Sequence, residues 1–296
     1  MLGMKSLSAP THHDLAGETL WYHEIRDIHN RHFHDPWQER ADTINQRYAL
    51  PRAHMLLTHG PGVPMPWFNG NIAVVEPGRW VLVISLNHQI NPDAHDASAR
   101  YARAKYTPAT YWDHWRTFNT DHWYRDFFGP LAQVAAAALG ERLTKEQEPA
   151  FATNRMIFVE ICPYDSNKFN LPWQAIQELL ATDLGFQRAA EVNHLLIEKG
   201  RPALVMVNGV KAIDMVEHLY ADSLKWQEIH YDSCDLPREG RKPKRLRHYC
   251  GSLHISNRTV SVIGFPFLRT PMTHNSNGEV ALLANHALAC STNRGR

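Results

Sequence analysis

The sequence lacks several features that are typical of particular protein classes. Its four cysteines lie far apart and form no CxxC pair, which argues against a zinc ribbon or an iron–sulfur site. With 31 Lys and Arg against 30 Asp and Glu, the formal net charge is +1, so no global positive field indicates a polyanion partner. No signal-peptide core and no membrane-length apolar run is present. These absences predict a soluble cytoplasmic protein with buried free thiols.

Three common site motifs are missing as well. No GxGxxG follows the first predicted strand, and no GxxxxGK[ST] is present. Without a GxSxG elbow, a hydrolase triad has no position for its nucleophile. The histidines of HNRHFHD (His29, His32 and His34) are a weak metal candidate, because a helix break at Pro36 and the lack of a clear acidic or thiolate companion leave the ligand set incomplete. We therefore expect no cofactor and no metal.

The pattern of apolar residues predicts an α/β fold. Near-continuous apolar runs at 80–86, 155–161, 203–207 and 259–263 alternate with segments of helical spacing, which favours a central, mainly parallel four-stranded sheet covered on both faces. A further short strand is predicted at 72–75. Helical segments are predicted at 109–139, 173–184 and 210–220, and two helices broken near Pro36 within 17–48. We expect a helical N-terminal extension, residues 1–58, packed on an α/β domain, residues 59–296.

The residues that follow the strands are where a site is expected, since open parallel sheets bind ligands at the carboxyl ends of their strands. These residues, called the strand exits below, are Asn87, the segment 160–164, Asn208-Gly209 and the segment 265–270.

The order of these exits resembles the uracil-DNA glycosylase superfamily over about residues 65–285. Ser85-Leu86-Asn87 stands where that family's first core strand ends in an Asp or Asn that orients the attacking water. Tyr111-Trp112 resembles an aromatic pair on its next helix, and 201–212 (RPALVMVNGVKA) is similar to its third strand. The segment 265–270 (FPFLRT) occupies the place of the family's minor-groove loop.

The resemblance implies hydrolysis of an N-glycosidic bond. Asn87 would hold the water through its amide oxygen; the alternatives are an amide that caps the following turn, or Asn91 as the holder. Phe265 stands where most relatives carry His. His274 is then the nearest candidate for assisting the departing base, and loop ordering is its alternative role.

Glu160 interrupts an apolar strand, where a buried unpaired carboxylate is costly. Relatives place an Asn at this strand end to read uracil. A Glu accepts from an exocyclic amine and repels a carbonyl, so the resemblance implies a cytosine-type base. The alternatives are a Glu paired with a neighbouring Arg or Lys such as Lys168, or Asn154 or Asn167 as the true equivalent.

The remaining candidates contact the base or the DNA. Trp67, Phe68 and Tyr164 are predicted to stack on a flipped base and Asn208 to bind it, whereas Trp112, Trp115, Trp123 and Phe127 have helical spacing typical of core. Phe267, Leu268, Arg269 and Thr270 would enter the minor groove, with Arg269 where relatives intercalate Leu. Arg241, Lys242, Lys244 and Arg245 begin a basic run that would contact phosphates, unless it is a solvated loop or a nuclear signal.

The sequence thus predicts a monofunctional DNA glycosylase that flips a modified, cytosine-type pyrimidine, with DNA as its partner and no obligate protein partner. A role in repair or in defence against foreign DNA would suit it. The alternatives are a catalytically inactive DNA-binding module of the same fold, a uracil- or mismatch-specific glycosylase, and an enzyme acting on free nucleosides.

Overall fold

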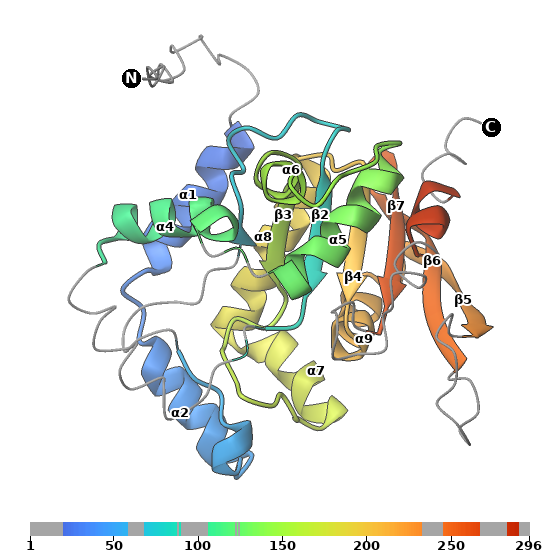
Figure 1. The fold of residues 1–296 in the computed structure, drawn as a ribbon. Coiled ribbons are helices and arrows are strands. Elements are labelled where there is room, and N and C mark those ends of the chain that lie inside the picture. The colour runs from blue at the N-terminus through green and yellow to red at the C-terminus, as the bar shows by residue number, and fades with distance from the viewer. Residues whose placement is uncertain are drawn as a thin grey trace, which may run out of the picture.

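A computed structural model describes residues 20–58, 68–87, 89, 106–121, 123, 125–232, 245–266 and 283–289 of the chain. In this part of the chain a single sheet of seven strands has the order β1-β3-β2-β4-β7-β6-β5 (Figure 1). The strands are β1 (Phe68–Asn69), β2 (Val81–Ser85), β3 (Met156–Glu160), β4 (Leu204–Asn208), β5 (Leu224–Asp232), β6 (Arg245–Ile255) and β7 (Arg258–Phe265).

The four strands predicted from apolar runs form the centre of this sheet. β3, β2, β4 and β7 are parallel neighbours, as expected. The predicted total of four strands is wrong, because β1 pairs antiparallel with β3 at one side, and β6 and β5 continue antiparallel from β7 at the other. β5 and β6 were missed because their sequences, LKWQEIHYD and RLRHYCGSLHI, lack the continuous apolar run of a strand that is buried on both faces.

The strand predicted at 72–75 is instead a turn. The Asn71 side chain accepts a hydrogen bond from the backbone N–H of Ala73 at 3.3 Å, a local contact that competes with strand pairing. Ile72 and Val75 are buried at 1% and 9% exposure, whereas Val74 is 47% exposed. The apolar run therefore reflects buried turn residues and one exposed valine.

The helices agree with the predicted segments in the main. They are α1 (Leu20–His32), α2 (Trp37–Arg47), α4 (Pro108–Asp121), α5 (Arg125–Ala138), α6 (Glu148–Arg155), α7 (Trp173–Thr182), α8 (Leu184–Glu198) and α9 (Val210–Leu219), with a 3-10 turn η1 (Arg52–His54). The break at Pro36 is confirmed. The segment 109–139 contains two helices rather than one, and α6 and α8 were not predicted. Asp183 caps α8 by accepting from the N–H of Phe186 at 3.1 Å.

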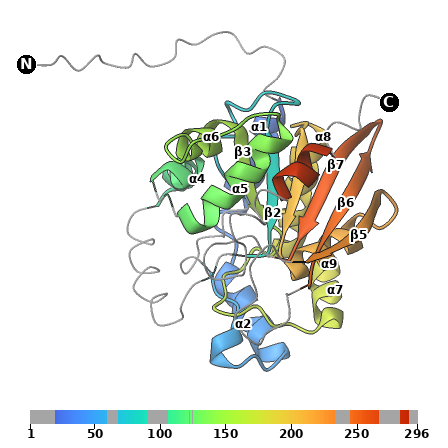
Figure 2. The same cartoon turned by 45° about the vertical axis from the view of Figure 1, so that its right-hand side comes forward.

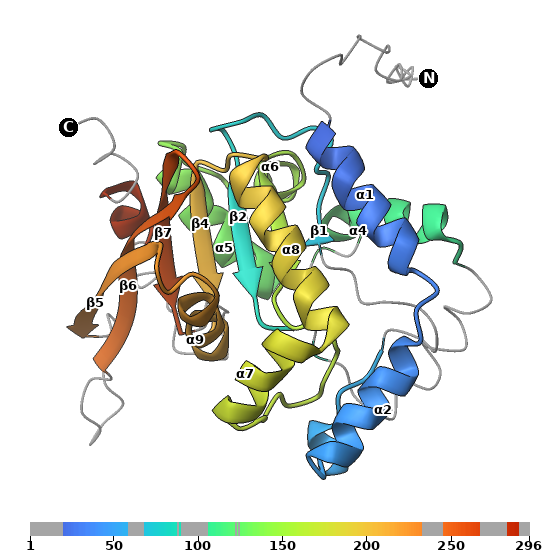
Figure 3. The ribbon, with the colours of Figure 1, turned by 180° about the vertical axis from the view of Figure 1, so that it is seen from behind.

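Helices cover both faces of the parallel centre, which confirms the α/β class. Alternate residues such as Val83 and Phe158 pack with apolar side chains of α5 and α6, and the short helix at 283–289 lies on this face too (Figure 2). The intervening residues, such as Ile84, pack on the opposite face, where α7, α8 and α9 lie (Figure 3). Each central strand is therefore buried from both sides.

The N-terminal helices join this second core. Ile25 and Ile28 of α1 and Trp37 of α2 belong to the same cluster of buried side chains as Ile84. Leu57 also forms an isolated antiparallel bridge with Asp165, just beyond β3. These contacts attach the N-terminal segment to the strand exits; the domain boundary at residue 58 stays a prediction.

The cysteines are not all alike. Cys162 is a buried free thiol, as predicted, and burial raises its pKa well above the usual value. The prediction is wrong for Cys250, which is disulfide-bonded to a partner outside the described residues. Spacing along the chain could not reveal the disulfide, because connectivity cannot be deduced from sequence alone. None of the helices in the described ranges has the length and apolar character that crossing a bilayer requires.

Candidate functional site

The parallel strands end in a row of aligned side chains. Ser85 of β2 pairs with Glu160 of β3 on one side and with Asn208 of β4 on the other, and Asn208 pairs with Phe265 of β7. Paired residues on parallel strands point to the same face, and Phe265 packs in the cluster on the α5 side. Glu160, Ser85 and Asn208, called the polar row below, therefore share that side at the carboxyl end of the sheet.

Ser85 lies at the centre of the polar row and was not among the predicted site residues. It is 8% exposed, and its Oγ is buried without a hydrogen-bond partner among the described residues. A buried hydroxyl that lacks a partner costs about 1–3 kcal/mol, so such groups are uncommon unless a ligand or water satisfies them. The only sequence signal for it is a serine that ends a continuous apolar run.

Asn208 is almost fully buried, at 1% exposure, where the chain turns sharply from β4 into α9. The next residue, Gly209, has φ of +116°, which favours glycine, and its N–H donates to the carbonyl of Phe265 at 2.9 Å. This bond fixes the exits of β4 and β7 side by side. Asn208 remains a candidate base-binding residue.

Asn87, two residues beyond Ser85, is half-buried and connects two strand exits. Its Nδ2 donates to the carbonyl oxygen of Tyr164 at 2.9 Å and to Oγ of Ser166 at 2.8 Å. A carbonyl only accepts, so the amide nitrogen must face the loop after β3, and Oδ1 is left with no hydrogen-bond partner in the described part of the chain. The bonds reach across to that loop rather than capping the turn after β2.

The loop after β3 is held from several sides. Leu57 and Asp165 exchange two backbone hydrogen bonds of 2.9 Å, and Nε2 of Gln89 donates to the carbonyl of Asn167 at 3.2 Å. With the two bonds from Asn87, these contacts fix residues 164–167. Asp165, which sequence reasoning missed, is 0% exposed within this loop.

Two carboxylates of this region affect the pKa of Tyr111 on α4. Burial raises the pKa of Tyr111 well above its usual value, and the charges of Asp165 and Glu160 raise it further. Tyr111 therefore stays a neutral phenol. The Tyr111 ring packs in a cluster with Phe33 and Trp115.

Glu160 is half-buried at the end of β3. An ion pair between Glu160 and Lys168 is not formed, because Lys168 pairs with no carboxylate in the described ranges; pairing of Glu160 with another Arg or Lys stays a prediction. Asn154 lies on α6 before β3 begins, at the other end of the strand, so it is not the equivalent. Asn167 belongs to the held loop. Glu160 is the polar side chain at the exit itself.

Two predicted stacking residues are structural. Tyr164 is 1% exposed; its hydroxyl donates to both carboxylate oxygens of Asp183 at 3.0 Å, and burial raises its pKa. Phe68 is 4% exposed in β1, with its ring centroid 4.6 Å from that of Trp112. Neither ring has a face free for a base, so both assignments are corrected: the apolar surroundings of the sheet cover them.

Trp123 is a better candidate for stacking on a base than Tyr164 or Phe68. Trp112 and Trp115 are core, as predicted, but Trp123 and Phe127 are only half-buried. Trp123 stacks on Phe128, with ring centroids 5.5 Å apart, and Phe128 contacts Phe158, two residues before Glu160. Trp123 is therefore a stacking candidate that helical spacing had assigned to the core.

Several predicted residues lie outside the described part of the chain and stay predictions. They are Trp67, His274, Asn91, Phe267, Leu268, Arg269, Thr270, Arg241, Lys242 and Lys244. Arg245 is the first residue of β6, and its side chain is likewise outside the description.

No metal centre is found in the described residues, where no group of three or more His, Cys, Asp or Glu could hold an ion. His29 is buried at 3% exposure, whereas Nδ1 of His32 lies 2.8 Å from a carboxylate oxygen of Asp35. The three histidines of HNRHFHD therefore do not form a ligand set.

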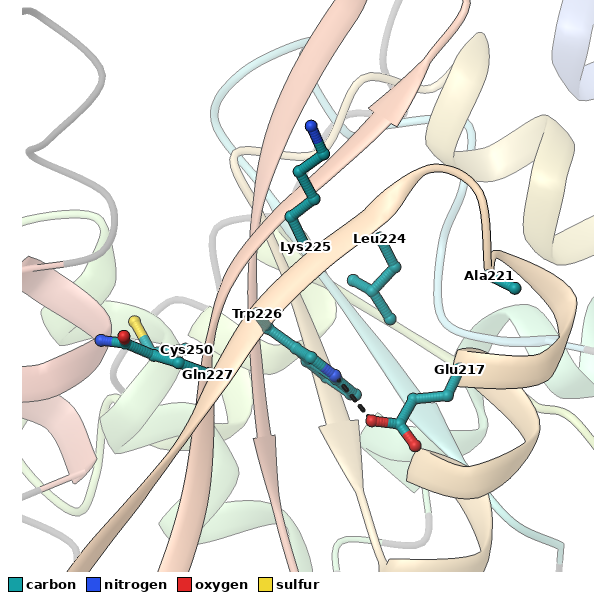
Figure 4. Close-up of a pocket in the computed structure, with 7 residues that line it drawn as sticks. All are labelled: Glu217, Ala221, Leu224, Lys225, Trp226, Gln227 and Cys250. Atoms are coloured by element: carbon teal, nitrogen blue, oxygen red, sulfur yellow. Dashed lines mark hydrogen bonds between the residues drawn. The ribbon is translucent and has the colours of Figure 1, made fainter.

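Two clefts lined by described residues lie away from the polar row. One, of about 720 Å³, lies between α9 and β5, where Nε1 of Trp226 donates to Glu217 at 2.8 Å (Figure 4). The other, of about 400 Å³, includes Arg201 and Pro202 near the opposite, amino end of the parallel strands. Neither contains a residue of the polar row or Asn87.

No protein-family model matches the chain, and no curated protein matches its sequence. The family resemblance stays a prediction.

Proposed function

We propose that the protein is a monofunctional DNA glycosylase that flips a cytosine-type, modified pyrimidine and hydrolyses its N-glycosidic bond. The observation that carries the proposal is the arrangement at the strand exits. The Asn87 amide is fixed by two hydrogen bonds, its Oδ1 has no hydrogen-bond partner in the described part of the chain, and Ser85 of the polar row lies two residues before it in the sequence.

The chemistry requires a positioned water and donors or acceptors for the base. Water oxygen attacks C1′ of the sugar, the bond from C1′ to the base nitrogen breaks, and the base leaves with the electron pair; the proton that the water loses finally neutralises the departed base. Asn87 Oδ1 accepts a hydrogen bond from the water and orients it without taking its proton, so rate enhancement comes from positioning and electrostatics.

The hydrogen bonds also give a reason for an amide rather than a carboxylate at this position. An Asp at residue 87 would place a carboxylate oxygen against the Tyr164 carbonyl, where two acceptors repel each other. The amide of Asn87 therefore holds the loop after β3, but it is a weaker general base than a carboxylate would be. A slow catalyst is the expected result.

Recognition of the base is assigned to the polar row. A carboxylate at Glu160 accepts from an exocyclic amine and repels a carbonyl at the same place, which favours cytosine over uracil. Trp123 supplies a half-exposed ring for stacking. Removal of modified cytosines from damaged or foreign DNA is the corresponding biological role.

The first experiment measures base release. Duplexes that each contain one uracil, cytosine, 5-methylcytosine or 5-hydroxymethylcytosine are incubated with the protein; abasic sites are detected by alkaline cleavage and free bases by mass spectrometry. We expect release of a cytosine-type base, and a loss of about a hundredfold or more in rate for Asn87→Ala.

A matched control is Asn193→Ala. Asn193 is buried on α8 and its Nδ2 donates to a backbone carbonyl at 2.8 Å, but it lies on the other face of the sheet. It should lower stability and leave the rate per folded molecule unchanged. Rapid release of uracil alone would contradict the cytosine assignment, and release unaffected by Asn87→Ala would contradict the site.

One observation favours a second candidate, a DNA-binding module without catalysis. Phe265 is 1% exposed and packs in the core at the fourth strand exit, so this position supplies no proton donor to a departing base. Duplex binding that weakens steeply with salt, with no base released from any duplex, would establish this alternative. Release of base from free nucleosides, unaltered by Arg269→Ala, would instead indicate a nucleosidase.

A further inference from the structure

Packing does not account for the environment of Ser85. It lies between Glu160 and Asn208 on adjacent parallel strands, which are spaced about 4.8 Å apart. Its hydroxyl is buried yet has no hydrogen-bond partner among the described residues, although its own carbonyl accepts from the N–H of Ile161 at 3.0 Å. The backbone of Ser85 is thus used by the sheet and its side chain is not.

We propose that Ser85 is a specificity-determining residue that donates its hydroxyl hydrogen to the central ring nitrogen, N3, of a flipped cytosine-type base. This inference rests on the proposed function, and it adds a residue that the family resemblance does not assign.

The polar row matches the hydrogen-bonding edge of such a base in order. That edge presents an amine donor at position 4, an acceptor at N3 and an acceptor at O2. The row presents a carboxylate acceptor at Glu160, a hydroxyl at Ser85 and an amide at Asn208, whose Nδ2 can donate. Three strands set side by side thus present an acceptor, a donor and a donor.

Glu160 determines whether the Ser85 hydroxyl donates or accepts a hydrogen bond to the base. A hydroxyl can donate or accept, so alone it would tolerate either the N3 of cytosine or the N3–H of uracil. An ionised carboxylate only accepts, so it selects the amine, and a base with an amine at position 4 has an unprotonated N3. Ser85 therefore donates, and a base that lacks this acceptor leaves the buried hydroxyl unpaired.

The test uses binding, so that it does not depend on catalysis. The probe is a duplex with one 2′-fluoroarabinosyl cytosine, whose glycosidic bond resists hydrolysis, compared with the same duplex carrying the 3-deaza analogue, in which N3 is replaced by C–H. The wild-type protein should bind the cytosine duplex about tenfold more tightly. Ser85→Ala should lose this preference, with equal affinities for the two duplexes.

The matched control is Ser261→Ala. Ser261 is similarly buried, at 6% exposure, but it pairs with Leu204 at the start of β4, the opposite end of the strand from Asn208. This variant should keep the wild-type preference. The supporting result requires that Ser85→Ala still binds both duplexes, with equal affinity, because a variant that does not fold binds neither.

The outcomes separate the two proposals. Equal binding of the two duplexes by the wild-type protein, or an unchanged preference in Ser85→Ala, overturns the role of Ser85 even if base release is observed. A preference that Ser85→Ala abolishes, without base release from any natural duplex, supports Ser85 and overturns hydrolysis. No binding of either duplex by the wild-type protein overturns the role of Ser85, whereas hydrolysis is then decided by base release in the first experiment.

Discussion

Ile84 and Ser85 are adjacent on β2, and both are buried, but they represent two different regions of the sheet. Ile84 is 0% exposed in the apolar interior that the strands share with α7, α8 and α9. Ser85 belongs to the polar row at the carboxyl end of the sheet, and its hydroxyl has no hydrogen-bond partner among the described residues. Burial stabilises the protein at the first position and costs stability at the second.

This contrast is informative because proteins tolerate such a cost mainly where function needs it. Apolar side chains fill the interior, whereas Ser85 is aligned with two other polar side chains at one edge of the sheet. The comparison predicts that changes in the interior alter stability alone, whereas changes at the edge alter function with small effects on stability.

The largest effect is expected in the interior. Ile84→Ala should lower the free energy of unfolding by about 2–5 kcal/mol, since it removes buried methyl groups and leaves a cavity. Urea denaturation measures it, with the exposed Val74 changed to Ala as the control, for which the loss should stay below about 0.5 kcal/mol. A loss below about 1 kcal/mol for Ile84→Ala would mean that the interior is not tightly packed.

A buried polar group away from the edge sharpens the comparison through pH. Burial lowers the pKa of His29 to about 4, and the charge of Arg26 adds to this, while a hydrogen bond with Asn30 opposes it. In the unfolded chain the group titrates near its ordinary value of 6.5. Stability from neutral His29 is therefore present above that pH and is lost as the pH falls toward 4.

The loss should reach roughly 2 kcal/mol at pH 5. His29→Phe, which suits the surrounding rings of Phe33 and Tyr111, should lower the proton uptake on unfolding by about one. His248, whose pKa is also lowered to about 4, keeps its contribution in both proteins. An unchanged pH profile of stability in His29→Phe would contradict the assignment.

A smaller effect on stability is expected at Asn87. Asn87→Ala removes two hydrogen bonds to the loop after β3, which should lower the free energy of unfolding by about 1–2 kcal/mol. Asn87→Asp should not restore it, because the carboxylate faces a carbonyl. Hydrogen exchange of the amides at 164–167 would localise the loss. Protection that is unchanged there would show that the bonds do not hold the loop.

The smallest effect, and of the opposite sign, is expected at Ser85. Ser85→Ala removes a buried hydroxyl that has no described partner, so stability should be unchanged or rise by up to about 1 kcal/mol. Thermal and urea unfolding measure it, with Ser261→Ala, which should not gain stability, as the control. A loss of more than about 1 kcal/mol in the free energy of unfolding would mean that the Ser85 hydroxyl stabilises the fold, as the interior side chains do.

Sequence reasoning located the central strands because each is buried on both faces, and it placed Asn87, Glu160 and Asn208 at their exits. It failed where burial is one-sided, as in β5 and β6. Among the site residues it misjudged Tyr164, since an aromatic after a strand looks the same whether it lines a pocket or fills the core. Ser85 was overlooked because a terminal serine carries no signal of an unpaired hydroxyl.

The sequence by itself determined the α/β class, the parallel strands and the polar character of their ends, since apolar periodicity and strand breakers act locally along the chain. Only the tertiary structure decided the strand order, the alignment of Glu160, Ser85 and Asn208, and the bonds that turn the Asn87 amide toward the loop after β3. Register and hydrogen-bond partners depend on segments more than 70 residues apart, and local patterns carry no information about them.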